Sequence, residues 1–144
     1  MKKISLFVVI FAASAIAAFS QGNAADQAVI KGTPAYAEVL LRKTELLADL
    51  EAFTPDYTEA NPKILELRAE LASIDRSLTR ILAVKPAEAG RLTEALGRMM
   101  VKKAALEADL SHLSRQYNKD YPDVKRAQRR VDLYESAIND ILKQ

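Results

Sequence analysis

Apolar residues recur along most of this chain at alternating steps of three and four, which is typical of amphipathic helices that pack along one stripe. Four such stripes follow one another between residues 39 and 141. Their members are Val39, Lys43, Leu46, Leu50, Phe53 and Tyr57; Ile64, Leu67, Leu71, Ile74, Leu78 and Ile81; Met99, Lys103, Leu106, Leu110, Leu113 and Tyr117; Val124, Ala127, Val131, Tyr134, Ile138 and Ile141. Lys43 and Lys103, the polar members, are expected to fix the register or to reach solvent. The pattern predicts an all-α protein with coiled-coil seams.

The first two stripes are repeated in the last two, because residues 33–82 correspond to residues 93–142. Each copy is interrupted at the same place by polar residues and a proline, and proline cannot continue a helix. The turn residues are Tyr57 and Pro62 in the first copy and Tyr117 and Pro122 in the second. Helices joined by short turns pack antiparallel, so the sequence predicts two tandem antiparallel helical hairpins. A compact four-helix arrangement and an extended hairpin with kinks in place of turns both remain open.

Helix starts are indicated by residues that can cap free backbone N–H groups. Thr33 and Asn61 each precede a proline, which fits the first position of a helix. These two residues therefore predict the starts of the first and second helices. The third helix has two candidate starts, Pro86 and Thr93.

The chain divides into four predicted parts. Residues 1–24 resemble an export signal, with a basic start and an apolar stretch that is shorter than the roughly twenty residues needed to span a bilayer. Residues 25–32 lack periodicity and are predicted to be a flexible leader. The first hairpin is expected over residues 33–85 and the second over residues 86–144. The sequence thus predicts a periplasmic or secreted protein that contacts a membrane only through an uncleaved signal.

Composition argues against several classes of function. The chain has 21 basic and 19 acidic residues, and Lys2 and Lys3 belong to the predicted signal, so the mature chain is formally neutral and nucleic-acid binding is not expected. Cysteine is absent, and His112 is the only histidine, so thiolate and histidine metal sites have little material. We find no phosphate-binding loop, paired-carboxylate site or nucleophile motif. We therefore predict a non-enzymatic protein without a cofactor or metal.

The two copies differ in surface charge. Glu66 and Glu70 of the first copy correspond to Arg126 and Arg130 of the second, and each pair lies on one helical face. Ion pairs between the copies and independently solvated charges both fit this pattern. The basic patch of the last helix consists of Lys125, Arg126, Arg129 and Arg130. This patch fits an anionic polymer, a phospholipid headgroup or an acidic partner, and also fits a solvated face.

The segments around the turns resemble a known family. Residues 50–64 and 110–124 each combine a leucine-rich helix, a tyrosine, a polar turn, a proline and then isoleucine or valine. They are similar to the periplasmic coiled coils of polysaccharide chain-length determinant proteins, which pair such coiled coils with flanking transmembrane helices. This resemblance implies a role in the export or length control of surface polysaccharide.

The size, export signal and hairpin pattern also resemble small periplasmic helical stress proteins, the Spy- and CpxP-like chaperones and metal sensors. Their Leu-Thr-x-x-Gln motif is echoed by residues 53–57, where Tyr57 replaces the glutamine. A chaperone needs an apolar face that is open to clients. Met99, Met100 and Val101 would contribute to such a face, and their alternative place is the core.

We therefore expect an exported, non-enzymatic structural or adaptor protein of the cell envelope, linked by the first resemblance to surface polysaccharide export. The alternative is a periplasmic chaperone or stress-responsive binding protein. The expected partner is another protein or a second copy docked through the helical seams. An anionic polymer is a further candidate.

Overall fold

The structure, a computed structural model, describes residues 24–143. Its helices are a short helix over residues 24–31, α2 (Pro34–Phe53), α3 (Pro62–Leu82), the 3₁₀ helix η1 (Pro86–Arg91), α4 (Glu94–Gln116) and α5 (Pro122–Lys143). The described residues contain no strand, so the predicted all-α class is confirmed. Residues 1–23, which hold nearly all of the predicted signal, lie outside the described residues.

Prolines and caps set the helix starts, although one predicted cap acts differently. Before Pro62, the Oδ1 atom of Asn61 accepts a hydrogen bond from the backbone N–H of Lys63 at 2.8 Å. The Thr93 hydroxyl accepts one from a backbone N–H of α4 in the same way. The Thr33 hydroxyl instead donates to the carbonyl of Ile30 at 2.7 Å. Thr33 therefore closes the preceding helix and makes no side-chain cap for α2.

Both candidate starts of the third helix are used, because Pro86 opens η1 and Thr93 precedes α4. The predicted flexible leader at residues 25–32 is wrong. Residues 24–31 form a helix, and the Ile30 side chain is only 2% exposed within the main core. A single apolar anchor with tertiary partners is enough to order a segment that shows no periodicity of its own.

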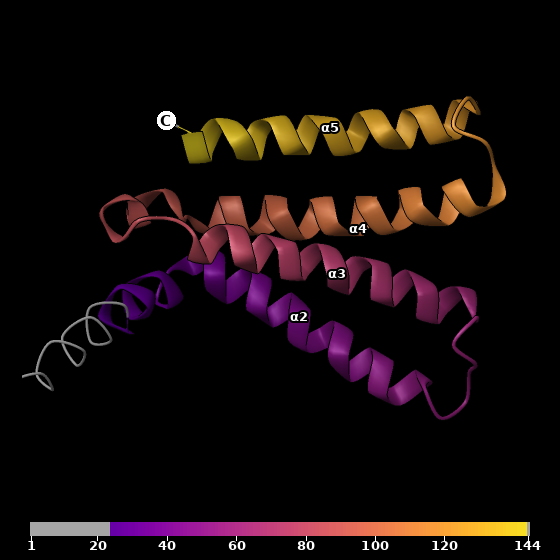
Figure 1. Cartoon of the computed structure of the whole chain (residues 1–144), viewed down its shortest axis with the longest axis horizontal. Helices are drawn as coiled ribbons and strands as arrows, with labels where there is room; N and C mark the ends of the chain where they lie inside the picture. Colours follow the sequence, from indigo (N-terminus) through magenta and orange to yellow (C-terminus); the bar gives the residue numbers. More distant parts are fainter. Residues whose placement is uncertain (1–23, 144) are drawn as a thin grey trace, which may run out of the picture.

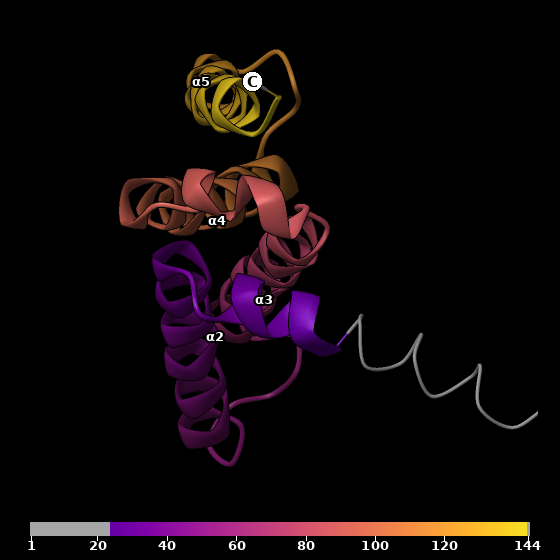
Figure 2. The same cartoon turned by 90° about the vertical axis from the view of Figure 1, so that its left-hand side faces the viewer.

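Helix α4 is the central helix of the molecule. Helices α2 and α3 pack against each other and against α4, whereas α5 packs mainly against α4 (Figure 1). Figure 2 shows α5 on one side of α4 and the α2–α3 pair on the other. Consecutive helices run in opposite directions, so both turns, at residues 54–61 and 117–121, lie at the same end of the molecule. The result is an open stack in which α2 and α5 are the outermost helices.

The main core lies where α4 meets the first helix pair. Its fully buried members include Val39 of α2, Ile74 of α3 and Met100 of α4. Gly97 allows the close approach of α4, because a Cβ atom there would lie 2.9 Å from the Cα atom of Ala35. The glycine that weakens α4 as an isolated helix thus permits its tertiary contact.

Candidate interaction site

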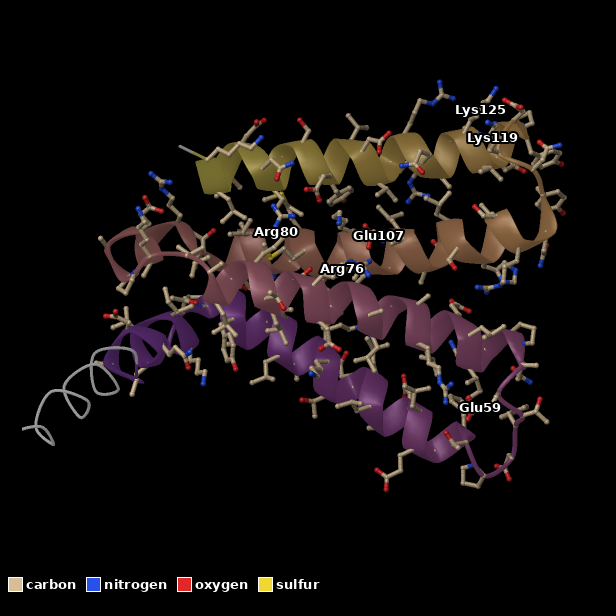
Figure 3. The ribbon with its side chains drawn as sticks, viewed as in Figure 1. Glu59, Arg76, Arg80, Glu107, Lys119 and Lys125 are labelled. Carbon is tan, nitrogen blue, oxygen red and sulfur yellow. The ribbon has the colours of Figure 1, made fainter. Side chains whose placement is uncertain are left out.

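A network of charged side chains joins α3, α4 and α5. The Nζ atom of Lys103 lies 2.7 Å from Oε1 of Glu107 and 3.0 Å from Oε2 of Glu135. On α3, Arg76 donates to Glu107 at 2.8 Å and Arg80 donates to Glu135 at 3.1 Å. Figure 3 shows Arg76, Arg80 and Glu107 where these helices meet. The network therefore ties the outermost helix α5 to both α3 and α4.

The two carboxylates of this network are held in their charged form. Burial works to raise the pKa of Glu107, but hydrogen bonds from Lys103 and Ser73 outweigh it and keep that pKa below its usual value. Burial also opposes ionisation of Glu135, and here Lys103 and Arg80 lower the pKa. Both carboxylates thus stay ionised and paired with the basic side chains, and their charge serves to hold the helices together.

The first repeat contains a matching ion pair. The Nζ atom of Lys43 lies 2.7 Å from Oδ1 of Asp75. Lys103 and Glu135 are the residues sixty positions later, and they form the equivalent pair between α4 and α5. Each seam lysine thus binds a carboxylate on the next helix, at equivalent positions in the two repeats. Such a pair fixes the register of two helices.

Glu70 is paired differently from the prediction made from surface charge. Its two carboxylate oxygens accept hydrogen bonds from Arg42 of α2, at 2.7 and 3.0 Å. This bidentate pair raises the pKa of Arg42 and leaves Glu70 buried. The predicted pairing of Glu70 with Arg126 or Arg130 is therefore wrong. Helix α3 turns Glu70 toward α2, and α4 lies between α3 and α5.

The predicted basic patch on α5 is divided between two surfaces. Lys125 and Arg129 border a shallow recess of about 340 Å³ that also includes Lys119, and Lys125 pairs with Asp120 at 3.1 Å. Figure 3 shows Lys119 and Lys125 beside the α4–α5 turn. The other two arginines line a separate cleft, so the four charges do not act as one surface.

That cleft has a volume of about 500 Å³ and runs along α4 and α5. It is lined by Glu66, Leu106, Asp109, His112, Leu113, Asp123, Arg126, Ala127 and Arg130. Arg126 pairs with Asp123 of its own helix. The cleft brings Glu66 near the arginines with which it was expected to pair.

The predicted turn residues lie in the two turns at one end of the molecule. Tyr57 and Tyr117 are exposed and do not close the helical seams, because α2 ends at Phe53 and α4 ends at Gln116. Tyr117 stacks on Tyr121, with 4.4 Å between ring centroids. Pro62 and Pro122 are the first residues of α3 and α5.

A surface that does not belong to the predicted seams lies on the outside of α2. We call it the outer α2 face, and it consists of Ala37, Leu40, Leu41, Thr44, Leu47 and Ala48. All six residues are exposed, and Leu41 reaches 58%. The signal in the sequence was that Leu40, Leu41 and Leu47 are apolar but fall outside the seam of their helix. A helix that is apolar on more than its packed face indicates a second partner.

The apolar face expected around Met99 and Met100 is not open. Met100 is 1% exposed, and Met99 and Val101 are half-buried against the main core. These residues therefore belong to the core, which was the alternative to an open face. Among the described helices, α2 carries the largest group of exposed leucines, Leu40, Leu41 and Leu47, and Leu133 of α5 is also exposed.

No helix in the described part of the chain combines the length and hydropathy needed to cross a bilayer. Within residues 24–143, the histidine and acidic side chains also form no cluster suited to a metal ion. Comparisons of the chain with protein-family models, curated proteins and solved structures return no match. The roles implied by the two resemblances therefore stay predictions.

Proposed function

We propose that this chain is an exported helical module of the cell envelope that acts by contact, as a structural or adaptor protein. The observation that carries the proposal is the outer α2 face. Leu40, Leu41 and Leu47 lie within two turns of one helix and are all exposed. Burying a fully exposed leucine side chain is worth roughly 1.5–3 kcal/mol, and these three are between 40% and 58% exposed, so each would gain roughly half of that from a partner.

The distribution of charge supports a function by contact. Scattered single leucines on a surface are normal, but these three are grouped on the helix with the most apolar exterior. The ionised groups of the Lys103 network are used to join helices, and the Arg42–Glu70 pair does the same between α2 and α3. These charged groups thus hold the helices together, and the exposed leucines of α2 are available to contact a partner.

The chaperone alternative makes a different prediction. A client-binding face would suppress aggregation of a denatured test protein, and Leu41→Gln would weaken that suppression. An adaptor with one defined partner would leave aggregation of unrelated clients unchanged. The polysaccharide role would be supported by loss of surface polysaccharide when the chain is deleted from its host.

A photocrosslinking amino acid placed at Leu41 tests the contact proposal directly in the host cell. We expect a discrete adduct of higher mass, because the residue lies on the outer α2 face. The matched control is the same group at Ala72, an exposed position on α3 outside this face. Equal labelling at Leu41 and Ala72 would argue against a partner on α2.

A further inference from the structure

The internal repeat gives each residue of α2 a counterpart on α4, and the two sets differ in burial. The α4 residues buried against the first repeat are Leu96, Gly97, Met100 and Ala104. Their counterparts on α2 are Tyr36, Ala37, Leu40 and Thr44. Three of these four are exposed, and only Tyr36 is partly covered. The outer α2 face therefore corresponds to the surface of α4 that packs on the first repeat. Among the described residues, no preceding repeat covers this face of α2.

The groove that receives α4 on the first repeat also has a counterpart. Ser73 of α3 donates a hydrogen bond to Glu107 of α4. Sixty positions away from these residues are Leu133 of α5 and Leu47 of α2. Both leucines are exposed, Leu133 to 71%. A polar contact within the chain thus corresponds to two solvent-facing leucines on the two outermost helices (Figure 2).

We propose that a second copy of this chain fills both surfaces, with the outer α2 face of one copy docked on the α4–α5 pair of the next. This inference rests on the proposed function and names its partner. In this arrangement, Leu47 of one copy meets Leu133 of the next. The contact joins two different surfaces, so copies add head to tail and form either a ring or a row.

The internal repeat indicates a second copy as the occupant, and the charges at the proposed contact are compatible with it. Arg42 and Glu70 are an ion pair in the first repeat. Their counterparts are Lys102 and Arg130, which are both positive and therefore cannot form the same pair, and Arg130 lines the cleft that also contains Asp109 and Glu66. Helices α3 and α4 are antiparallel, so one turn beyond the contact of residues 73 and 107 brings position 111 beside position 70. The counterpart of position 111 is Glu51, and the docked α2 therefore places the Glu51 carboxylate beside Arg130.

The fit between copies differs from the internal fit in one respect. The close approach of α4 to Ala35 depends on Gly97, because a Cβ atom there would lie within 2.9 Å of the Ala35 Cα atom. The counterparts of these two residues are Ala95 and Ala37. The docked α2 consequently lies slightly farther from the partner's α4, and the exposed leucines fill the added space.

Disulfide trapping tests the docked register, because the chain has no cysteine of its own. Leu47→Cys and Leu133→Cys are made in separate full-length chains, one of which carries a tag. The two variants are mixed and oxidised. A disulfide forms only where the Cα atoms come within about 7 Å. We expect the mixed disulfide to exceed either homodisulfide by at least about tenfold, because docking raises the effective concentration of the two thiols.

The matched control pairs Leu133→Cys with Asp56→Cys, an exposed position in the first turn. A mixed yield no higher than in this control would overturn the proposal. Dominance of the Leu47→Cys homodisulfide would also overturn it, in favour of two α2 helices facing each other. If trapping fails while the photocrosslinker at Leu41 captures another protein, the proposed function stands and the second copy is excluded as its partner. Failure of both experiments would overturn both proposals.

Discussion

The Nζ atom of Lys103 lies 3.0 Å from Oε2 of Glu135, and the side chain of Lys103 is only 13% exposed. The equivalent pair sixty positions earlier, Lys43 with Asp75, has a more exposed lysine, at 32%. The same contact therefore lies in two environments, because Arg76 and Arg80 of α3 also bind the carboxylates that pair with Lys103. The difference makes the two lysines a matched pair for measurement.

Replacement of Lys103 by alanine leaves Glu107 and Glu135 without their shared cation. We expect a loss of about 1–3 kcal/mol in the free energy of unfolding, measured by urea denaturation. Lys43→Ala removes one pair near the surface, for which we expect less than about 1 kcal/mol. Equal losses for the two variants would contradict the central role of the network.

The stability of the protein should decrease at acid pH. Glu107 and Glu135 have folded-state pKa values below the usual value of 4.5. Their contribution is therefore fully present above the pKa of the unfolded chain and is lost as the pH falls through the folded values. We expect urea midpoints to fall below about pH 4.5. Glu107→Gln should reduce the fall of the urea midpoint at acid pH. An unchanged pH profile in that variant would argue against a contribution of Glu107 to the acid sensitivity.

Gly97 and Gly90 test the close packing of α4. Gly97→Ala places a Cβ atom 2.9 Å from the Cα atom of Ala35, so we expect a loss of about 1–3 kcal/mol in thermal or urea unfolding. At Gly90 no atom lies within 4 Å of the added Cβ. Gly90→Ala should be neutral or stabilising by about 0.4–1 kcal/mol, because it restricts the unfolded chain. A tolerated Gly97→Ala would mean that α4 lies farther from α2.

Substitutions of two leucines of α2 distinguish the face that packs in the core from the outer α2 face. Leu46 is fully buried, and Leu46→Ala should cost about 2–5 kcal/mol of stability. Leu41 is exposed, so Leu41→Gln should change stability by less than about 0.5 kcal/mol while weakening association. Urea unfolding and gel filtration of the two variants measure these effects. A large loss of stability from Leu41→Gln would place that residue in the core.

The pattern of the sequence predicted the helices well, because their ends depend on local chemistry. Pro62 and Pro122 begin α3 and α5, and the apolar seams place residues such as Leu46 and Ile138 inside. The helix over residues 24–31 could not be predicted in this way. Its order depends on Ile30, whose apolar neighbours come from segments distant in sequence.

The surface was less predictable than the helices, because partner choice depends on how helices are rotated and stacked. Glu70 shares a helical face with Glu66, yet it binds Arg42, because α2 and not α5 lies beside it. The outer α2 face could be interpreted only after the burial of the corresponding residues of α4 was known. Leu40 becomes informative only when its counterpart Met100 is found in the core.

Sedimentation equilibrium of two charge-reversal variants tests the central claim most directly, that the outer α2 face is a contact surface which docks on the α4–α5 pair of another copy. Glu51→Arg and Arg130→Glu each place like charges at the proposed contact, and each variant alone should associate about tenfold more weakly than the parent protein. An equimolar mixture should recover parental association, because each variant then meets a partner of opposite charge. Association that is unchanged in both variants, or that the mixture does not restore, would contradict the account.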